Sequence, residues 1–267
     1  MSQKILCVTD LDGTFIKDSI RINDEDLQAY RKLKTFSDFS IATGRSIKEI
    51  DYITHNKVSS NHFIAFNGAL IENQNHNILF KKCIPPVTVK KILHFLKQEK
   101  LIFDALDGNE RIGNFHHEHP ERLWNMELKT PADPFHALEH LSIYKFNVRP
   151  ERAQTSTYVK KLKDALPECE VYQSGGTRIE ITAKNVSKGE ALKHISRDYD
   201  LIIAIGDSGN DISMFEEASL SFCMSHAPEN VKKHATYVVD SFNEAVDHIY
   251  ELLVQSRKCA HTPLPIL

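Results

Sequence analysis

Two pairs of acidic residues lie near opposite ends of this 267-residue sequence, and each pair directly follows a short apolar run of strand length. Asp10 and Asp12 form the first pair, and Asp207 and Asp211 form the second. Because ligands of an open parallel sheet bind beyond the carboxyl ends of its strands, we expect these carboxylates to lie around one point. Converging carboxylates require a cation, and hard oxygen ligands suit Mg²⁺. The sequence therefore predicts a magnesium-dependent phosphoryl-transfer enzyme.

The first pair can be divided into a nucleophile and an acid/base. A carboxylate can attack phosphorus and form an aspartyl-phosphate, which splits hydrolysis into two easier displacements, and Asp10 is the candidate. We expect Asp12 to stay protonated, to give its proton to the leaving alcohol and later to take one from water. The turn at Gly13-Thr14 lets the chain bend so that both carboxylates serve one substrate. Two neighbouring acids in different environments commonly share these two roles.

Four further residues are candidates for binding the phosphate or supporting the metal. Lys188 is at the first helical position after the predicted N-cap Ser187, so its ammonium group and the helix amides can address one anion. Thr43 offers a hydroxyl group at the end of a predicted strand and leads into Gly44, whose backbone can approach a phosphate closely. We expect Asp211 to lie behind the metal and to orient metal-bound water or Lys188.

The composition argues against several classes of protein. The 33 basic and 36 acidic residues give a formal charge of −3, which gives no support to binding of nucleic acid or of an anionic membrane. The apolar runs are far shorter than the roughly 20 residues that span a bilayer, and the N-terminus shows no secretory pattern. The cysteines have neither metal-ligand nor disulfide spacing. We therefore predict a cytoplasmic protein that acts on a small molecule, and its oligomeric state stays open. The five cysteines are Cys7, Cys83, Cys169, Cys223 and Cys259.

The order of the predicted elements indicates an α/β protein with a doubly wound parallel sheet as its core. Strand and helix patterns alternate over residues 1–82 and again over residues 183–267. Asn23, the capping box Ser46–Glu49 and the capping box Ser187–Glu190 are predicted to open helices. The predicted core strands are at 5–8, 39–42, 62–66 and 201–205, with a hairpin at 69–80 and a helix from 188 to about 197.

Residues 83–182 interrupt this core, and their pattern predicts an inserted α+β domain. In a strand pattern near its end, Ile179 and Ile181 alternate with polar residues, which predicts a strand that is buried on one face and belongs to an antiparallel sheet. The predicted elements of the insert are a helix at 87–97 and strands at 142–148, 170–173 and 178–182.

Taken together, these motifs resemble those of the haloacid dehalogenase-like (HAD) phosphatases and, more narrowly, the Cof-type branch, subclass IIB. The core motifs that carry the resemblance are Asp10-Leu11-Asp12-Gly13-Thr14, Thr43-Gly44-Arg45, Lys188 and Gly206-Asp207-Ser208-Gly209-Asn210-Asp211. Also typical of that branch are Asn67-Gly68-Ala69 and Val186-Ser187-Lys188-Gly189. The resemblance covers the whole chain, and the insert is matched mainly by its position and size.

The resemblance implies a role for each motif residue. Asp10 would be the nucleophile and Asp12 the acid/base. Mg²⁺ would be held by the Asp10 carboxylate, the Asp12 backbone carbonyl and Asp207. Because the insert lies between Thr43 and Lys188, the resemblance makes it a type-2 cap over the active site, which argues against the sugar-phosphate mutases of the superfamily. The residues implied for the phosphate are Thr43, Lys188 and Asn210.

Three residues are weaker candidates for substrate contacts. Arg45 and Asn67 follow core strands at the predicted active-site edge, where we expect both to contact the substrate. Arg45 could instead pair with a surface acid, and Asn67 could simply form a turn. Arg178 lies on the polar face of a cap strand, where it would either contact the substrate or form a cross-strand ion pair.

Two aromatic or histidine-rich features of the insert invite other hypotheses. His116, His117 and His119 lack a spacing that places metal ligands on one face, so we expect a solvated cap loop, with a substrate contact as the alternative. Trp124 is the single tryptophan, and we expect it in the cap core rather than as a platform for a sugar.

The prediction is a magnesium-dependent phosphatase of small phosphomonoesters, which by resemblance are most often sugar phosphates. The alternatives are a nucleotide, flavin-precursor or pyridoxal phosphatase, and a non-catalytic sugar-phosphate sensor. The presence of both Asp10 and Asp12 favours an enzyme, because binding alone needs no acid/base. The sequence does not name the physiological substrate.

Overall fold

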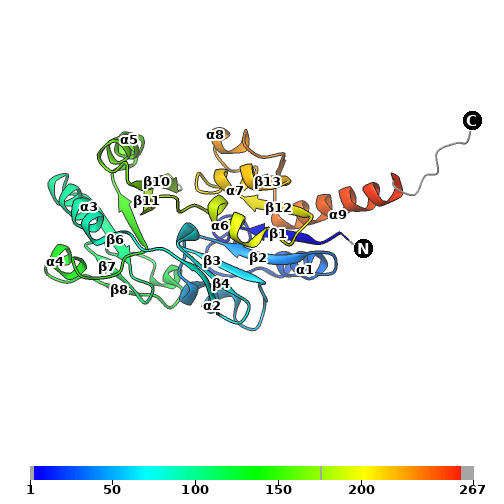
Figure 1. Ribbon diagram of the computed structural model, residues 1–267, viewed down its shortest axis with the longest axis horizontal. Coiled ribbons are helices and arrows are strands. Elements are labelled where there is room, and N and C mark those ends of the chain that lie inside the picture. The colour runs from blue at the N-terminus through cyan, green and yellow to red at the C-terminus, as the bar shows by residue number, and fades with distance from the viewer. Residues whose placement is uncertain (1–2, 175, 260–267) are drawn as a thin grey trace, which may run out of the picture.

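The computed structural model describes residues 3–174 and 176–259, which form two β-sheets (Figure 1). The strands of the larger sheet are β1 Ile5–Thr9, β2 Asp38–Ala42, β3 His62–Ala65, β4 Leu70–Asn73, β5 Ile78–Lys81, β12 Leu201–Gly206, β13 Leu220–Met224 and β14 Tyr237–Val239. Their order is β14-β13-β12-β1-β2-β3-β4-β5. The pairs from β14 to β3 are parallel, and the hairpin β4–β5 continues the sheet in antiparallel fashion. This is the predicted parallel core.

The central strand β1 is buried on both faces, as a strand in a doubly covered parallel sheet should be. Ile5 and Cys7 pack into one hydrophobic cluster that includes residues of α1 and α9. Leu6 and Val8 pack into a second cluster with residues of α6 and α7 on the other face. The core helices are α1 Asp24–Leu33, α2 Ile47–Thr54, α6 Lys188–Ile195, α7 Ile212–Glu217, α8 Glu229–Lys232 and α9 Phe242–Cys259, with a short 3₁₀ helix at Phe66–Gly68.

Local capping fixes the helices that lead into the site. Ser46 and Glu49 form the predicted reciprocal capping box at the start of α2. The Ser187 hydroxyl accepts a hydrogen bond from a backbone N–H of the first turn of α6, so Lys188 is the first helical residue, as predicted. The helix ends at Ile195, slightly earlier than the pattern predicts.

The smaller sheet lies beside the larger one in Figure 1, on the side away from α9. Its strands are β6 Ile102–Leu106, β7 Glu110–Gly113, β8 Glu127–Lys129, β9 Lys145–Arg149, β10 Cys169–Ser174 and β11 Arg178–Ala183, in the order β10-β11-β9-β6-β7-β8. Every neighbouring pair is antiparallel except β7–β8. Its helices are α3 Pro86–Gln98, α4 Pro134–Leu138 and α5 Thr155–Ala165. We propose residues 83–182 as the cap and residues 1–82 and 183–267 as the core domain; 260–267 lie outside the described residues.

The prediction that β11 is buried on one face only is wrong. Ile179 and Ile181 are buried, but Glu180 and Thr182 on the opposite face are also at most 1% exposed. Glu180 is covered because it faces the core domain, where Asn67 donates a hydrogen bond to its carboxylate. A polar residue in a strand therefore marks an interdomain surface here rather than a solvated one.

Several strands are not revealed by the sequence pattern, and those of the cap show why. β6 and β7 each carry a charged residue, Asp104 and Arg111, and both side chains are buried and paired with each other. Charged residues are almost never fully buried unless they are paired, so a pattern search reads them as exposed. Because of these buried ion pairs, the sequence pattern of β6 and β7 does not look like that of buried strands.

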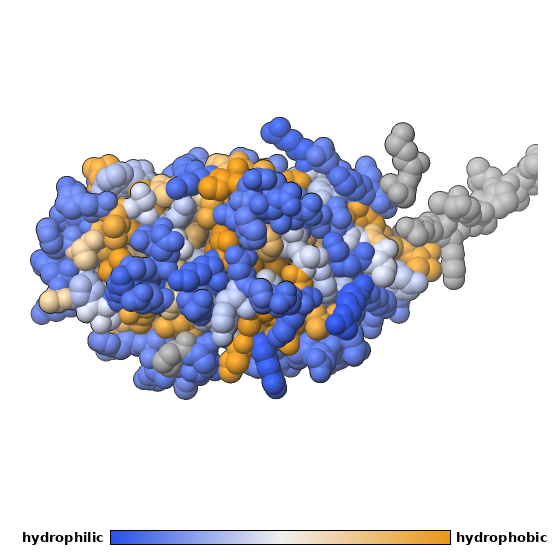
Figure 2. Space-filling model, turned by 90° about the horizontal axis from the view of Figure 1, so that it is seen from below, coloured by the Kyte–Doolittle hydropathy of each residue, from blue (hydrophilic) through white to orange (hydrophobic). Residues whose placement is uncertain are grey.

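The described part of the chain contains no helix that is long and apolar enough to cross a membrane. The face shown in Figure 2 is largely hydrophilic, with hydrophobic residues distributed between the polar ones. Four cysteines in the described residues are free thiols, namely Cys7, Cys83, Cys169 and Cys223.

Candidate active site

A buried lysine connects the two acidic pairs at the carboxyl ends of β1 and β12. The Lys188 ammonium group donates to Asp10 Oδ1 at 2.5 Å and to Asp211 Oδ1 at 2.6 Å, and the lysine side chain is fully buried. The other oxygen of Asp211 accepts hydrogen bonds from the backbone N–H groups of Asp207 and Ser208, both at 2.9 Å. Asp211 thus holds both the lysine and the loop that carries Asp207.

The charges of this cluster are not balanced by its own residues. Burial raises the pKa of Asp10 well above its ordinary value, and the carboxylates of Asp211 and Asp207 raise it further against the effect of Lys188. Burial also raises the pKa of Asp211. Burial alone would lower the pKa of Lys188, but its two carboxylate partners outweigh burial and raise that pKa. The lysine therefore stays charged, and the three aspartates leave an excess of negative charge that a cation would neutralise.

The donor set fits a hard divalent cation. One carboxylate oxygen from each of Asp10, Asp207 and Asp211 lies within 4.8 Å of the others. Asp207 is the most accessible of the three, and His226 Nε2 lies 3.3 Å from its Oδ2. Gly13 leaves room for the Asp207 side chain. The φ of Gly13 is +89°, and a Cβ at this position would lie 2.6 Å from Asp207 Oδ2. Oxygen ligands of this kind suit Mg²⁺.

Asp12 lies outside this cluster and is paired with an arginine. Arg45 Nε donates to Asp12 Oδ2 and Arg45 Nη2 donates to Asp12 Oδ1, both at 2.8 Å. Burial alone would raise the pKa of Asp12, but the Arg45 guanidinium outweighs burial and holds that pKa well below its usual range. The expectation that Asp12 is kept protonated is therefore wrong for this state of the protein, because the bidentate partner stabilises the carboxylate.

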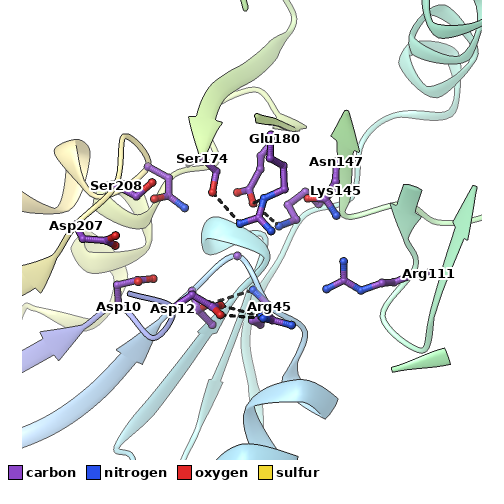
Figure 3. A pocket seen from close by; sticks show the side chains of 14 residues that line it. Asp10, Asp12, Arg45, Arg111, Lys145, Asn147, Ser174, Glu180, Asp207 and Ser208 are labelled. Carbon is purple, nitrogen blue, oxygen red and sulfur yellow. Dashed lines mark hydrogen bonds and ion pairs between the residues drawn. The ribbon is translucent and has the colours of Figure 1, made fainter. Parts of the chain in front are cut away.

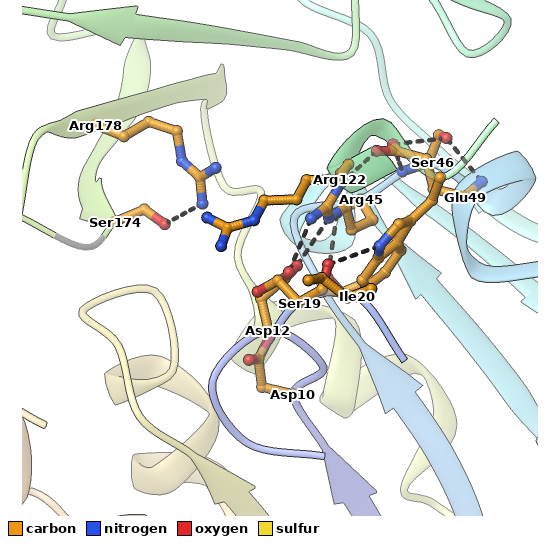
Figure 4. A network of polar contacts seen from close by, with 12 residues as sticks. Asp10, Asp12, Ser19, Ile20, Arg45, Ser46, Glu49, Arg122, Ser174 and Arg178 are labelled. Carbon is orange, nitrogen blue, oxygen red and sulfur yellow. Dashed lines mark hydrogen bonds and ion pairs between the residues drawn. The ribbon is translucent and has the colours of Figure 1, made fainter. Parts of the chain in front are cut away.

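Arg45 is itself held by both domains, as Figure 4 shows. Its Nη1 donates to Glu49 Oε1 of α2 at 2.9 Å and to the carbonyl oxygen of Arg122 in the cap at 2.6 Å. Its guanidinium lies 3.9 Å from the ring centroid of Trp124, whose Nε1 donates to the carbonyl oxygen of Ser19. Trp124 is fully buried as expected, but it packs at the cap–core interface rather than inside the cap.

The remaining core candidates surround the same point. Thr43 is buried, and its hydroxyl accepts a hydrogen bond from the backbone N–H of Arg45. Asn210 Nδ2 donates to Asn67 Oδ1 at 3.0 Å, and Asn67 Nδ2 donates to Glu180 Oε2 at 2.5 Å. Asn67 has a left-handed backbone, with φ 58°, which turns its side chain toward the cap strand. It is more than a turn residue, because its amide joins the core to the cap.

Most of these residues line one cavity of about 130 Å³ between the core and the cap (Figure 3). Its core wall includes seven of the candidates, whereas Asn67, Lys188 and Asp211 are buried and do not line it. The seven are Asp10, Asp12, Thr43, Gly44, Arg45, Asp207 and Asn210. Arg178 lines the cap wall, where it donates to Ser174 and pairs with Glu180, two positions away on its own strand. The other cap residues that line the cavity were not predicted from the sequence; they are Arg111, Lys145, Asn147, Ser174 and Glu180. The one signal in the sequence that could have identified such cap residues was a charged residue at an alternate position of a predicted strand.

The histidine-rich loop forms no site with metal-binding spacing. Among the described residues, the cluster of Asp10, Asp207 and Asp211 is the one group with such spacing. His119 instead pairs with Glu121, and both side chains are more than half exposed. The expectation of a solvated loop fits this arrangement.

The fold and the aspartate–lysine centre define a hydrolase of the α/β class with a cap. The chain matches the family model of haloacid dehalogenase-like hydrolases over residues 7–253, and it belongs to that family. The predicted resemblance to the HAD superfamily is therefore confirmed, as is the predicted class of fold.

Relatives with assigned names and solved structures agree with this family. The chain is 26% identical over 242 residues to a 5-amino-6-(5-phospho-D-ribitylamino)uracil phosphatase of Bacillus subtilis, covering 88% of this chain and 90% of the relative. It is 24% identical to an Escherichia coli protein of the same name, covering 91% and 93%. A HAD subclass IIB sugar phosphatase has the same fold, with a TM-score of 0.77, 22% identity and coverage of 92% and 98%. A haloacid dehalogenase-like hydrolase of B. subtilis superposes with a TM-score of 0.79, 20% identity and coverage of 90% and 96%.

Proposed function

We propose that this protein is a magnesium-dependent phosphatase that hydrolyses small phosphomonoesters, most often sugar phosphates, through an aspartyl-phosphate on Asp10. The observation that carries the proposal is the buried set of Asp10, Lys188 and Asp211, of which Asp10 lines a small polar cavity between the core and the cap. Asp10, Asp207 and the Asp12 backbone carbonyl would hold Mg²⁺. When bound, the metal supplies positive charge that balances the aspartates and the phosphate.

The residues can carry out two balanced displacements. The Asp10 carboxylate attacks phosphorus, the bond from phosphorus to the ester oxygen breaks, and a proton from Asp12 goes to the leaving alcohol. Water then attacks phosphorus, gives its proton to Asp12, and releases phosphate from Asp10. Lys188, Thr43 and the Gly44 backbone hold the phosphate oxygens during both steps. Asp12 can act as the acid once the substrate replaces Arg45 as its neighbour and a proton is taken up.

The size of the cavity supports a small substrate. Its volume of about 130 Å³ is small, and side chains of both the core and the cap bound it. The free cysteines of the described residues support the proposed reduced, cytoplasmic setting.

A flavin-precursor phosphatase is the second candidate, and two observations favour it. The named relatives act, by their names, on a ribitylaminouracil phosphate. A cleft of about 820 Å³ adjoins the cavity and shares Asp207 and Ser208 with it. A leaving group longer than a simple sugar would extend into this cleft.

The test is phosphate release from a panel of phosphorylated metabolites and p-nitrophenyl phosphate, with Mg²⁺ and with a chelator. Asp10→Asn should abolish release while keeping the fold, because the amide is a poor nucleophile. Asp164→Asn, at an exposed position of α5, is the matched control and should retain activity. The rank order of the esters separates sugar phosphates from the flavin precursor. Well-folded protein that binds esters but releases phosphate from none of them would favour the sensor.

A further inference from the structure

A buried lysine of the cap lines the cavity from the cap side and lies close to Gly44 of the core. Lys145 is on β9, where it pairs with Thr182 of β11 and Leu106 of β6. Its side chain is 3% exposed and lines the cavity, as Figure 3 shows. A Cβ on Gly44 would lie 2.8 Å from Lys145 Nζ, so the ammonium group sits directly over the backbone that follows Thr43.

The position of this ammonium group is set by a chain of side chains that crosses the two domains. Glu180 Oε1 accepts a hydrogen bond from Lys145 Nζ at 3.0 Å. The other oxygen of Glu180 accepts one from Asn67, and Asn67 accepts one from Asn210. Asn67 and Asn210 of the core thus fix the Glu180 carboxylate, which in turn fixes the cap lysine. The lysine reaches Gly44 because the cap is closed.

The protein satisfies only part of the hydrogen-bonding capacity of the Lys145 ammonium group. An ammonium has three donors, and among the described residues Glu180 is its one hydrogen-bond acceptor. Buried donors are nearly always satisfied, so two N–H groups enclosed in a polar cavity point to a ligand oxygen. Arg178 differs because its side chain as a whole is 38% exposed, although its Nε is buried and, within the described part of the chain, has only the ion pair with Glu180 at 3.2 Å.

We propose that Lys145 is a substrate-binding residue of the cap, whose ammonium group binds a phosphoryl oxygen of the substrate from the cap side. The inference rests on the proposed function and extends it, because it makes phosphate binding depend on closure of the cap. The phosphoryl group would then be held by two lysines, one from each domain. Glu180, Asn67 and Asn210 act as positioning residues for the cap lysine.

The protonation of the Lys145 ammonium group can be followed directly through the pH dependence of activity. Burial lowers the pKa of Lys145 to about 8; Glu180 offsets burial in part, and Arg178 and Arg111 lower the pKa further. These charged groups lie on β11 and β7, and the charged groups on the core side of the same cavity are Asp10, Asp12, Arg45 and Asp207. A bound dianion stabilises the charged lysine and raises its pKa. The kcat/KM profile, which reports free enzyme, should therefore fall above about pH 8, whereas kcat should fall at higher pH.

Two variants of Lys145 test this with p-nitrophenyl phosphate, a dianion above about pH 7 because phosphomonoesters have a second pKa near 6. Lys145→Met should raise KM at about pH 7 by roughly ten- to a hundredfold and remove the alkaline fall in kcat/KM. Lys145→Arg keeps the charge at all accessible pH values, so kcat/KM should stay flat to about pH 9.5. Lys161→Met removes an exposed cap lysine and should match the wild type.

The inference is overturned if Lys145→Arg and Lys145→Met leave both the KM and the alkaline fall in kcat/KM unchanged. Both variants would then lose thermal stability alone. That outcome would make the lysine a counter-ion of Glu180. If Lys145→Met fails to fold, a wild-type kcat/KM that is flat from about pH 7 to about pH 9.5 overturns it as well. Calorimetric titration of inorganic phosphate in the presence of Mg²⁺ separates the two proposals. Binding that weakens in Lys145→Met without any turnover by the wild type would refute the phosphatase and keep the site.

Discussion

Arg45 binds Asp12 through two parallel hydrogen bonds of 2.8 Å, and this pair connects the loop that follows β1 in the core to the cap. The same guanidinium contacts Trp124 and the Arg122 carbonyl of the cap. A bidentate arginine fixes both the position and the ionised state of a carboxylate. The acid/base candidate is therefore held in a defined geometry that depends on where the cap lies.

Removal of Arg45 should destabilise the protein more than removal of an exposed cation. Breaking a fully buried ion pair costs about 3–5 kcal/mol, and because the Asp12 side chain is 25% exposed we expect about 2–3 kcal/mol for Arg45→Met. The control, Lys32→Met, breaks an exposed pair with Asp247 and should cost less than about 1 kcal/mol. Urea unfolding measures the free energy of unfolding of both variants. Equal losses would contradict the larger contribution expected of the Asp12–Arg45 pair.

Glu49 should hold the cap in its closed position. Its Oε1 accepts from Arg45 Nη1 at 2.9 Å and from Arg111 Nη2 of β7 at 2.7 Å, and its side chain is fully buried. Glu49→Gln removes the charge that both arginines share, so we expect a loss on the order of 3 kcal/mol. Trp124 is the single tryptophan, and its emission should shift to the red as the indole meets water. Glu168→Gln breaks an exposed cap pair with Lys91 and should change neither quantity appreciably. An unshifted spectrum in Glu49→Gln would refute this role.

Gly13 should be required for metal binding more than for folding. An added methyl group would meet Asp207 Oδ2 at 2.6 Å, and the φ of +89° is strained for alanine. Gly108 in the cap has a φ of +108° with Tyr144 as its neighbour, so Gly108→Ala is a matched control for backbone strain. Both variants should lose on the order of 1 kcal/mol of stability, and Gly13→Ala alone should raise the Mg²⁺ concentration needed for half-maximal activity. Similar metal dependence in the two variants would refute the prediction.

Stabilisation by magnesium should grow with pH. The pKa values of Asp10 and Asp211 are raised in the folded protein, so the stability these groups contribute is present below the usual aspartate pKa of about 3.9 and is lost as pH rises through their folded values. A bound cation cancels the repulsion among the ionised aspartates. The rise in melting temperature on adding Mg²⁺ to chelator-treated protein should therefore be larger at about pH 7 than at about pH 5.

Asp207→Asn is the control for the magnesium experiment. It removes a proposed metal ligand that retains some exposure, so the rise in melting temperature should shrink at both pH values. An equal rise in the wild type and in Asp207→Asn would show that the ion binds elsewhere.

The core could be predicted because its signals are local. Asp10 and Asp207 end apolar runs that are buried in the structure, and Ser187 caps the helix that begins at Lys188. Strand burial, capping and turn formation depend on neighbours within a few positions. The cap sheet was harder because Asp104 and Arg111 look like surface residues until each is seen to be the other's partner.

From the sequence alone, the candidate groups at the core could be predicted, and so could the parallel strands that bring them together. The tertiary structure alone decided their state: Arg45, 33 positions from Asp12, keeps that acid ionised, and the cap places Lys145 over Gly44. The physical reason is that pKa values and donor satisfaction depend on burial and on charges within a few ångströms. Those neighbours come from segments that are distant in the chain, and folding of the cap onto the core brings them into contact.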